Sequence, residues 1–134
     1  MTQEEKDLLL KDLCARLPYG VKILTPTNCW TSEEDTCELK EIFKGDDGLF
    51  RIGDIGALIE YSKPYLLPMS SMTEEQKNEL NDTLIQLELK ALNDEIEHHK
   101  VAEFEIDFYN KNMFDYRGLI EKGLANDATG LNIY

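Results

Sequence analysis

Residues 73–98 read TEEQKNELNDTLIQLELKALNDEIEH, and this stretch carries the clearest helical pattern of the chain. Thr73 followed by Gln76 forms a capping box, in which each side chain accepts a hydrogen bond from the other residue's free backbone N–H. Apolar residues then recur at helical spacing in two adjacent stripes. The first stripe is Leu80, Leu84, Leu87 and Ala91, and the second is Ile85, Leu89, Leu92 and Ile96.

The two stripes predict one long helix that begins at Thr73 and reaches about His98. Their combined apolar face is wider than a helix on the surface of a domain requires. We therefore expect Leu84 and Leu87 to be buried in the core. The opposite face is acidic and should lie in solvent.

On the C-terminal side of this helix the pattern predicts three further segments. A second helix is expected over residues 102–110, where aromatic and aliphatic groups recur. Asp115 can cap a last short helix over residues 116–122, which Gly123 would end. Residues 126–134 are expected to form an extended tail.

On the N-terminal side a helix begins at Thr2, whose capping box is completed by Glu5, and ends at the Pro-Tyr-Gly of residues 18–20. Strands are predicted over residues 21–25, 36–43 and 49–52, the last two joined by a turn at 45–48. Residues 57–61 fit either a helical turn or a third hairpin strand. The expected fold is α+β in a single domain, 1–134. It has a small antiparallel sheet from residues 21–52, an N-terminal helix and a helical C-terminal half.

The chain is strongly acidic, with 27 acidic and 14 basic residues and a formal net charge of −13. Such a surface repels nucleic-acid phosphates and anionic lipid heads, so we expect no direct nucleic-acid binding and no membrane binding. The acidic excess lies mostly in residues 73–112, whereas residues 51–72 hold two acids and two bases. The N-terminus lacks the cationic and apolar runs of a signal peptide, so a cytoplasmic location is expected.

The three cysteines are Cys14, Cys29 and Cys37, and no two of them form a C-x-x-C unit. An odd number without that spacing predicts neither a disulfide framework nor a zinc knuckle. Cys14 lies on the apolar face of the first helix and is expected to be a small core residue. Cys29, beside Trp30 in a polar segment, is the cysteine most expected to be exposed.

His98 and His99 follow Glu95 closely enough for a carboxylate and an imidazole to share one helix face, as in carboxylate-bridged metal sites. No second histidine motif supplies the remaining ligands. We interpret the pair as residues at a helix C-terminus, which the helix dipole favours. No motif specifies a catalytic residue, a cofactor or a metal ion, and we expect the chain to fold without metal.

Two glycine-rich loops and one arginine have alternative interpretations. Residues 45–48 and 53–56 lack the lysine of a phosphate loop and the ligand spacing of a calcium loop, so we interpret the first as a turn and the second as a bulge or bend. Arg117 could bind an anionic ligand through its planar guanidinium. It could equally form an ion pair with the acidic long helix, which we favour.

An apolar run broken by prolines is the predicted partner-binding segment. Its charge is balanced, and aromatic and Met side chains are enriched at the centres of protein interfaces. The same run could instead cover the sheet as part of the core. The residues we assign to partner binding are Tyr61, Tyr65, Leu66, Met69 and Met72.

Three blocks of the chain resemble a group of short uncharacterised proteins from gut Bacteroidales and their mobile elements. They are LCARLPYGV at residues 13–21, KPYLLPMSSMTEE at 63–75 and FDYRGLIEKGLA at 114–125. The resemblance implies a bacterial origin and carries no activity, cofactor or partner. Residues 80–112 depart from the pattern of the group.

These features favour a non-enzymatic protein-binding or regulatory module. One alternative is a small hydrolase or transferase whose site is assembled only in three dimensions. Another is an acidic inhibitor that mimics nucleic acid and occupies the basic groove of a nucleic-acid-binding protein.

Overall fold

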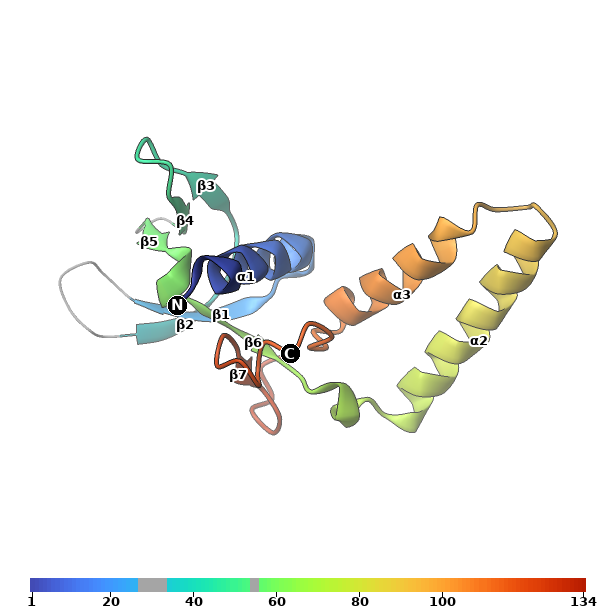
Figure 1. Cartoon of the computed structure of the whole chain (residues 1–134). Coiled ribbons are helices and arrows are strands. Elements are labelled where there is room, and N and C mark those ends of the chain that lie inside the picture. The colour runs from blue at the N-terminus through green and yellow to red at the C-terminus, as the bar shows by residue number, and fades with distance from the viewer. Residues whose placement is uncertain (27–33, 54–55) are drawn as a thin grey trace.

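A computed structural model describes residues 1–26, 34–53 and 56–134, and it confirms the α+β class. Figure 1 shows two parts: a body of helix and sheet, and a pair of helices that projects from it. We call residues 68–113 the arm and the remaining described residues the body. The elements in chain order are α1 (Gln3–Arg16), η1 (Leu17–Tyr19), β1 (Lys22–Pro26), β2 (Glu34–Glu38), β3 (Ile42–Lys44), β4 (Phe50–Ile52), β5 (Ala57–Leu58), η2 (Ile59–Tyr61), β6 (Lys63–Leu66), η3 (Met69–Ser71), α2 (Glu74–Leu92), α3 (His99–Lys111) and β7 (Asn126–Asp127).

The larger sheet has the strand order β2-β1-β6-β7. β1 pairs antiparallel with β2 and β6, and β6 pairs parallel with β7. Ile23 and Thr25 of β1 are buried while their neighbours along the strand are half-buried, as expected for a strand with one face on the core. β2 is an edge strand, and all five of its side chains are exposed.

The smaller sheet is the antiparallel meander β3-β4-β5. The single strand expected over residues 36–43 is wrong, because the chain leaves β2 after Glu38 and starts β3 at Ile42. The turn predicted at residues 45–48 is confirmed, and Asp47 there forms a two-point ion pair with Arg51 at 2.7 and 2.6 Å. Residues 57–61 supply both alternatives, a short strand and a 3-10 turn.

Helix α1 lies at the centre of the body. Its predicted capping box is present, with Thr2 Oγ1 accepting from the Glu5 backbone N–H at 3.1 Å. Leu9 and Leu13 are fully buried, whereas Cys14 is exposed, so the expectation that Cys14 belongs to the core is wrong. Around α1 the core gathers Val21, Ile23, Leu39, Ile52, Ile59, Leu66, Met113, Leu119, Leu124 and Ala125.

The arm is an excursion between two adjacent positions of the body. The chain leaves β6 at Leu67 and returns at Phe114, and these two residues pair in a parallel bridge. Leu67 N–H donates to the Met113 carbonyl and Asp115 N–H donates to the Leu67 carbonyl, both at 2.8 Å. The two ends of the arm are therefore fixed side by side.

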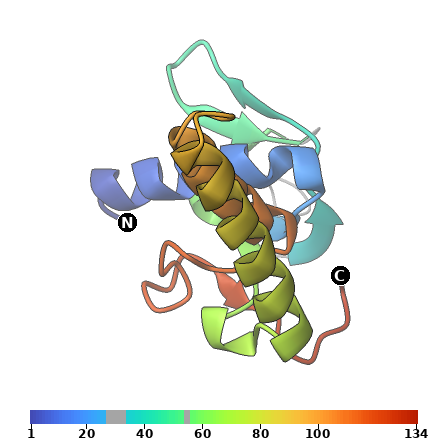
Figure 2. The same cartoon turned by 90° about the vertical axis from the view of Figure 1, so that its right-hand side faces the viewer.

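Within the arm α2 forms the outer layer, and α3 lies between it and the body (Figures 1 and 2). The capping box at Thr73 and Gln76 is confirmed. The helix ends at Leu92 and not at His98, because Asp94 adopts a left-handed backbone (φ 57°) that turns the chain back. The second helix is confirmed, with wider bounds than residues 102–110.

The helix expected over residues 116–122 is wrong, because these residues form successive turns. Asp115 therefore caps no helix, and its carboxylate instead accepts from Leu119 N–H at 2.8 Å and Ile120 N–H at 2.9 Å within these turns. Gly118 has a φ of 74°, a left-handed conformation that a helix over these residues could not include. The expected tail includes β7, and Ala128 N–H donates to the Leu66 carbonyl at 2.8 Å.

Candidate protein-binding surface on the arm

The inner face of the arm is closed by contacts between its two helices and the segment that follows. Leu80 is 5% exposed and packs with Phe108 and Phe114, whose rings stack at 6.5 Å between centroids. Leu84 and Leu87 are half-buried, so the expectation that both lie buried in the core is wrong. They are covered from one side only, because α3 is the neighbour that α2 packs along.

The second stripe of α2 remains in solvent. Ile85, Leu89 and Leu92 are 56%, 55% and 74% exposed, and we call these three residues the outer stripe. They are separated by four and three positions, so they stand above one another on one helix face. Ile96, the fourth member predicted from the sequence, lies beyond the end of α2 and is half-buried at the tip.

Acidic side chains flank the outer stripe. Glu88 lies about one turn from both Ile85 and Leu92, and Asp82 lies about one turn before Ile85. Both carboxylates are exposed. The arm as a whole holds eleven acidic and four basic residues, a formal net charge of −7. The apolar stripe is therefore set in a negative field.

A buried guanidinium fixes the base of the arm to the body. Arg16 of α1 is 0% exposed, and its Nε lies 3.0 Å from Asp12 Oδ2. Its Nη2 donates to the Phe114 carbonyl at 2.7 Å, and its Nη1 donates to the Tyr109 carbonyl at 3.4 Å. The Tyr109 carbonyl belongs to the last turn of α3, where a positive charge also complements the helix dipole.

Arg117 completes this ionic cluster. Its Nη1 lies 2.7 Å from Asp12 Oδ1, and its side chain is 13% exposed. Its guanidinium also lies over the ring of Tyr116, 4.5 Å from the centroid. The ion pair expected for Arg117 is present, but with α1 and not with the long helix. Anion binding by Arg117 stays a prediction.

The polar side chains near the base of α3 have partners. Tyr109 donates to Glu105 Oε1 at 2.6 Å, and burial, with help from this hydrogen bond, raises the pKa of Tyr109 to about 12. Tyr116 donates to Oδ1 of the buried Asn110 at 3.1 Å. Because these groups are satisfied internally, they brace the arm.

The segment predicted to bind a partner is divided among several environments. Tyr61 is 61% exposed on η2, whereas Leu66 is fully buried in the body core. Tyr65 is half-buried, with its hydroxyl accepting from Thr36 Oγ1 at 3.2 Å. Met69 and Met72 are half-buried against the cluster of Leu80, Phe108 and Phe114. Leu66 therefore contributes packing, and partner binding by the other four stays a prediction.

The histidines lie at the start of α3, so the helix C-terminus expected for them is wrong. His98 is the N-cap of α3, and His99 Nε2 lies 3.1 Å from Glu97 Oε2 and 3.7 Å from Glu103 Oε1. Within residues 1–26, 34–53 and 56–134 no group of three or more His, Cys, Asp or Glu side chains is arranged to hold a metal ion.

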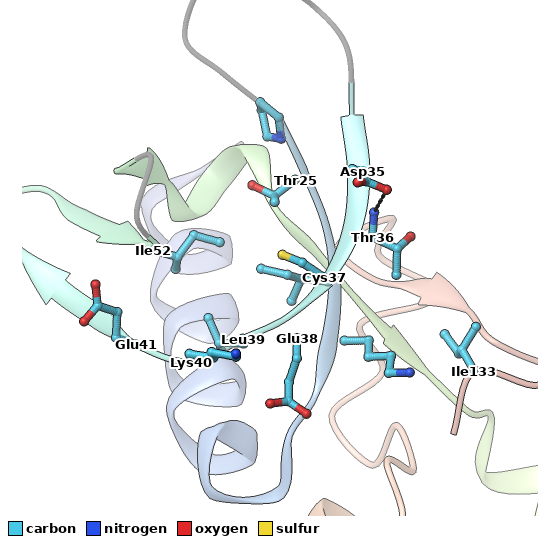
Figure 3. Close-up of a pocket in the computed structure, with 14 residues that line it drawn as sticks. Thr25, Asp35, Thr36, Cys37, Glu38, Leu39, Lys40, Glu41, Ile52 and Ile133 are labelled. Atoms are coloured by element: carbon cyan, nitrogen blue, oxygen red, sulfur yellow. Dashed lines mark hydrogen bonds between the residues drawn. The ribbon is translucent and has the colours of Figure 1, made fainter.

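A groove of ≈ 1010 Å³ runs along β2 (Figure 3). Cys37 and Ile52 lie on one side of the strand, and Thr36 and Ile133 lie on the other. The groove thus wraps around an edge strand, and its side chains do not converge on one point. Desolvation, with help from Asp35, raises the pKa of the Cys37 thiol, which disfavours the thiolate that a nucleophile needs. Cys29 and Trp30 lie outside the described residues.

Comparison with known proteins places the chain in no group. No family model matches it, and neither the curated proteins nor the solved structures include a match. In the part of the chain that the structure describes, no helix is both long enough and apolar enough to cross a membrane.

Proposed function

We propose that this chain is a non-enzymatic protein-binding module and that the outer stripe of α2 is its docking surface. The observation that carries the proposal is the exposure of Ile85, Leu89 and Leu92 on one face of a projecting helix. Single exposed apolar side chains are common, but three in register on one face form a continuous apolar strip. An arm of this kind presents the strip to a partner.

Energetics support the same role. Covering the three side chains would contribute on the order of 1 kcal/mol each, since more than half of each remains in water in the free protein. The arm is already anchored by the Arg16 cluster and by the Leu67–Phe114 bridge. A preorganised surface loses little conformational entropy when a partner binds, so more of this contribution remains as affinity.

The groove along β2 gives little support to the alternative that the chain is a small hydrolase or transferase. An active site brings a nucleophile, a base and an oxyanion site within reach of one substrate atom. The thiol of Cys37 has a raised pKa, and neighbouring side chains of β2 point to opposite faces. The acids of β2 instead protect an open sheet edge from pairing with other chains.

Site-specific photo-crosslinking in the native cells tests the proposal. A photoreactive amino acid replaces Leu89 of the outer stripe or, as a matched control, Gln86 of the same helix, which is also exposed. We expect one discrete adduct from position 89 that is absent from position 86 and is lost when Ile85 and Leu92 are changed to Gln. Equal labelling from both positions, or none from position 89, would contradict the proposal.

A further inference from the structure

We infer that the partner segment is a basic amphipathic helix that packs along the outer stripe, on the face of α2 that does not contact α3. This inference rests on the proposed function and names the chemistry of its partner. It uses three observations: the shape of the stripe, its position on the arm and the charge around it.

The shape of the stripe fits a helix. Ile85, Leu89 and Leu92 follow the four- and three-residue spacing of a helix seam, in which an apolar side chain repeats about every 3.5 residues. A second helix packs its own ridge into such a row at an axial separation of about 8–10 Å. The stripe runs the length of about two turns, so a partner helix of about three turns would cover it.

The position of the stripe leaves room for a third helix. α2 is the outer layer of the arm, and Figure 2 shows it in front of α3 with the body behind. The stripe belongs to the C-terminal half of α2, the half next to the tip and away from the body (Figure 1). A helix can therefore lie along it without contacting the body.

The charge around the stripe selects a basic partner. Asp82 and Glu88 border the three apolar side chains, and the arm carries a formal net charge of −7. Lys or Arg side chains flanking the apolar seam of a partner helix would face these carboxylates, as opposite charges do at the edges of paired helices. The negative charge of the arm disfavours a second copy of this chain as the occupant, because two arms would bring like charges together.

Binding of designed peptides tests the inference. The first probe is a fluorescent peptide of about three heptads with Leu at the seam positions and Lys at the flanking positions. The second has Glu in place of each Lys, and a third has the first composition in scrambled order. Anisotropy titrations use the full chain, the variant I85Q/L89Q/L92Q, which has the same charge, and the variant D82N/E88Q, which keeps the stripe.

We expect the Lys peptide to bind the wild-type chain, and the stripe variant to bind it at least about tenfold more weakly. Raising the salt from about 0.05 to about 0.3 M should weaken binding several-fold in the wild type and less in D82N/E88Q, because exposed charges are screened. The Glu and scrambled peptides should bind at least about tenfold more weakly than the Lys peptide.

Three results would overturn the inference. If the wild-type chain and I85Q/L89Q/L92Q bound the Lys peptide equally, the peptide would be attracted by the acidic surface alone and not by the outer stripe. Equal binding of the Glu peptide would refute the charge assignment while leaving the docking function in place. Sedimentation equilibrium of the chain alone could show a dimer that I85Q/L89Q/L92Q dissociates. That result would identify a second copy of the chain as the occupant of the outer stripe. Failure of the photo-crosslink at position 89, in contrast, would refute the docking function itself.

Discussion

Helix α1 in the body and helix α2 in the arm both carry several leucines, but they bury different shares of their apolar side chains. All four leucines of α1 are buried or half-buried. In α2, Leu80 is buried, Leu84 and Leu87 are half-buried, and the outer stripe is exposed. The reason is the number of neighbours: α1 is packed by sheets and connecting segments, whereas α2 has α3 on one side and solvent on the other.

The two regions also differ in charge. The arm has a net charge of −7 from eleven acidic and four basic residues, and the rest of the chain, about twice as long, has −6 from sixteen and ten. A higher charge density favours the solubility of an arm with an open apolar strip. The comparison teaches that the sequence shows how wide the apolar face of a helix is. Whether that face is buried depends on which elements the fold packs against it.

The largest effect is expected where the body holds the arm. Asp12→Ala leaves the guanidinium of Arg16 buried without its carboxylate and releases Arg117 from the same group. Removing one partner from a buried ion pair costs about 3–5 kcal/mol of unfolding free energy. Urea titration monitored by circular dichroism measures the loss. Lys11→Ala, at an exposed position of the same helix, should change stability by less than about 0.5 kcal/mol.

An intermediate effect is expected at the inner face of the arm. Leu80→Ala should cost about 2–4 kcal/mol, because it empties a site against Phe108 and Phe114. Leu84→Ala should cost less, since its side chain is already partly in water. Denaturant midpoints of the two variants give the ranking. A larger loss for Leu84 than for Leu80 would contradict the described packing.

A smaller effect is expected at the two capping boxes. Each has a Thr at the N-cap, so the same substitution can be compared in the body and in the arm. Thr2→Ala and Thr73→Ala should each cost about 1 kcal/mol, because each removes a side-chain acceptor for a free N–H at the helix start. Amide hydrogen exchange locates the change. The Thr73 variant should loosen the first turn of α2 and leave α1 protected. Uniform loosening of both helices would show that the arm does not open separately.

Features governed by local chemistry could be predicted from the sequence. Both capping boxes, the turn at residues 45–48 and the class of fold are confirmed. The end of α2 could not, because Ile96 continues the helical period beyond the point where Asp94 reverses the chain. The prediction of a helix over residues 116–122 was wrong for a related reason. Asp115 binds backbone N–H groups as an N-cap residue would, but Gly118 adopts a left-handed conformation that no helix contains.

The candidate surface was visible in the sequence only in part. The second stripe of the long helix stands out by its spacing, but a stripe covered by the core and a stripe left in solvent have the same pattern. The Asp12–Arg16 pair is also readable at helical spacing, whereas its link to Phe114, 98 positions from Arg16, depends on the tertiary fold. Sequence separation of this size leaves no local signal.

The central claim is that the outer stripe serves a partner and not the fold, and the unfolding free energy of I85Q/L89Q/L92Q tests it most directly. Gln keeps the helix propensity and the charge, so the change isolates the apolar surface. Because the three side chains are more than half exposed, we predict a change of no more than about 0.5 kcal/mol at each site and an unchanged circular dichroism spectrum. A loss as large as that of Leu80→Ala would show that the stripe is packed within the monomer and would contradict the account.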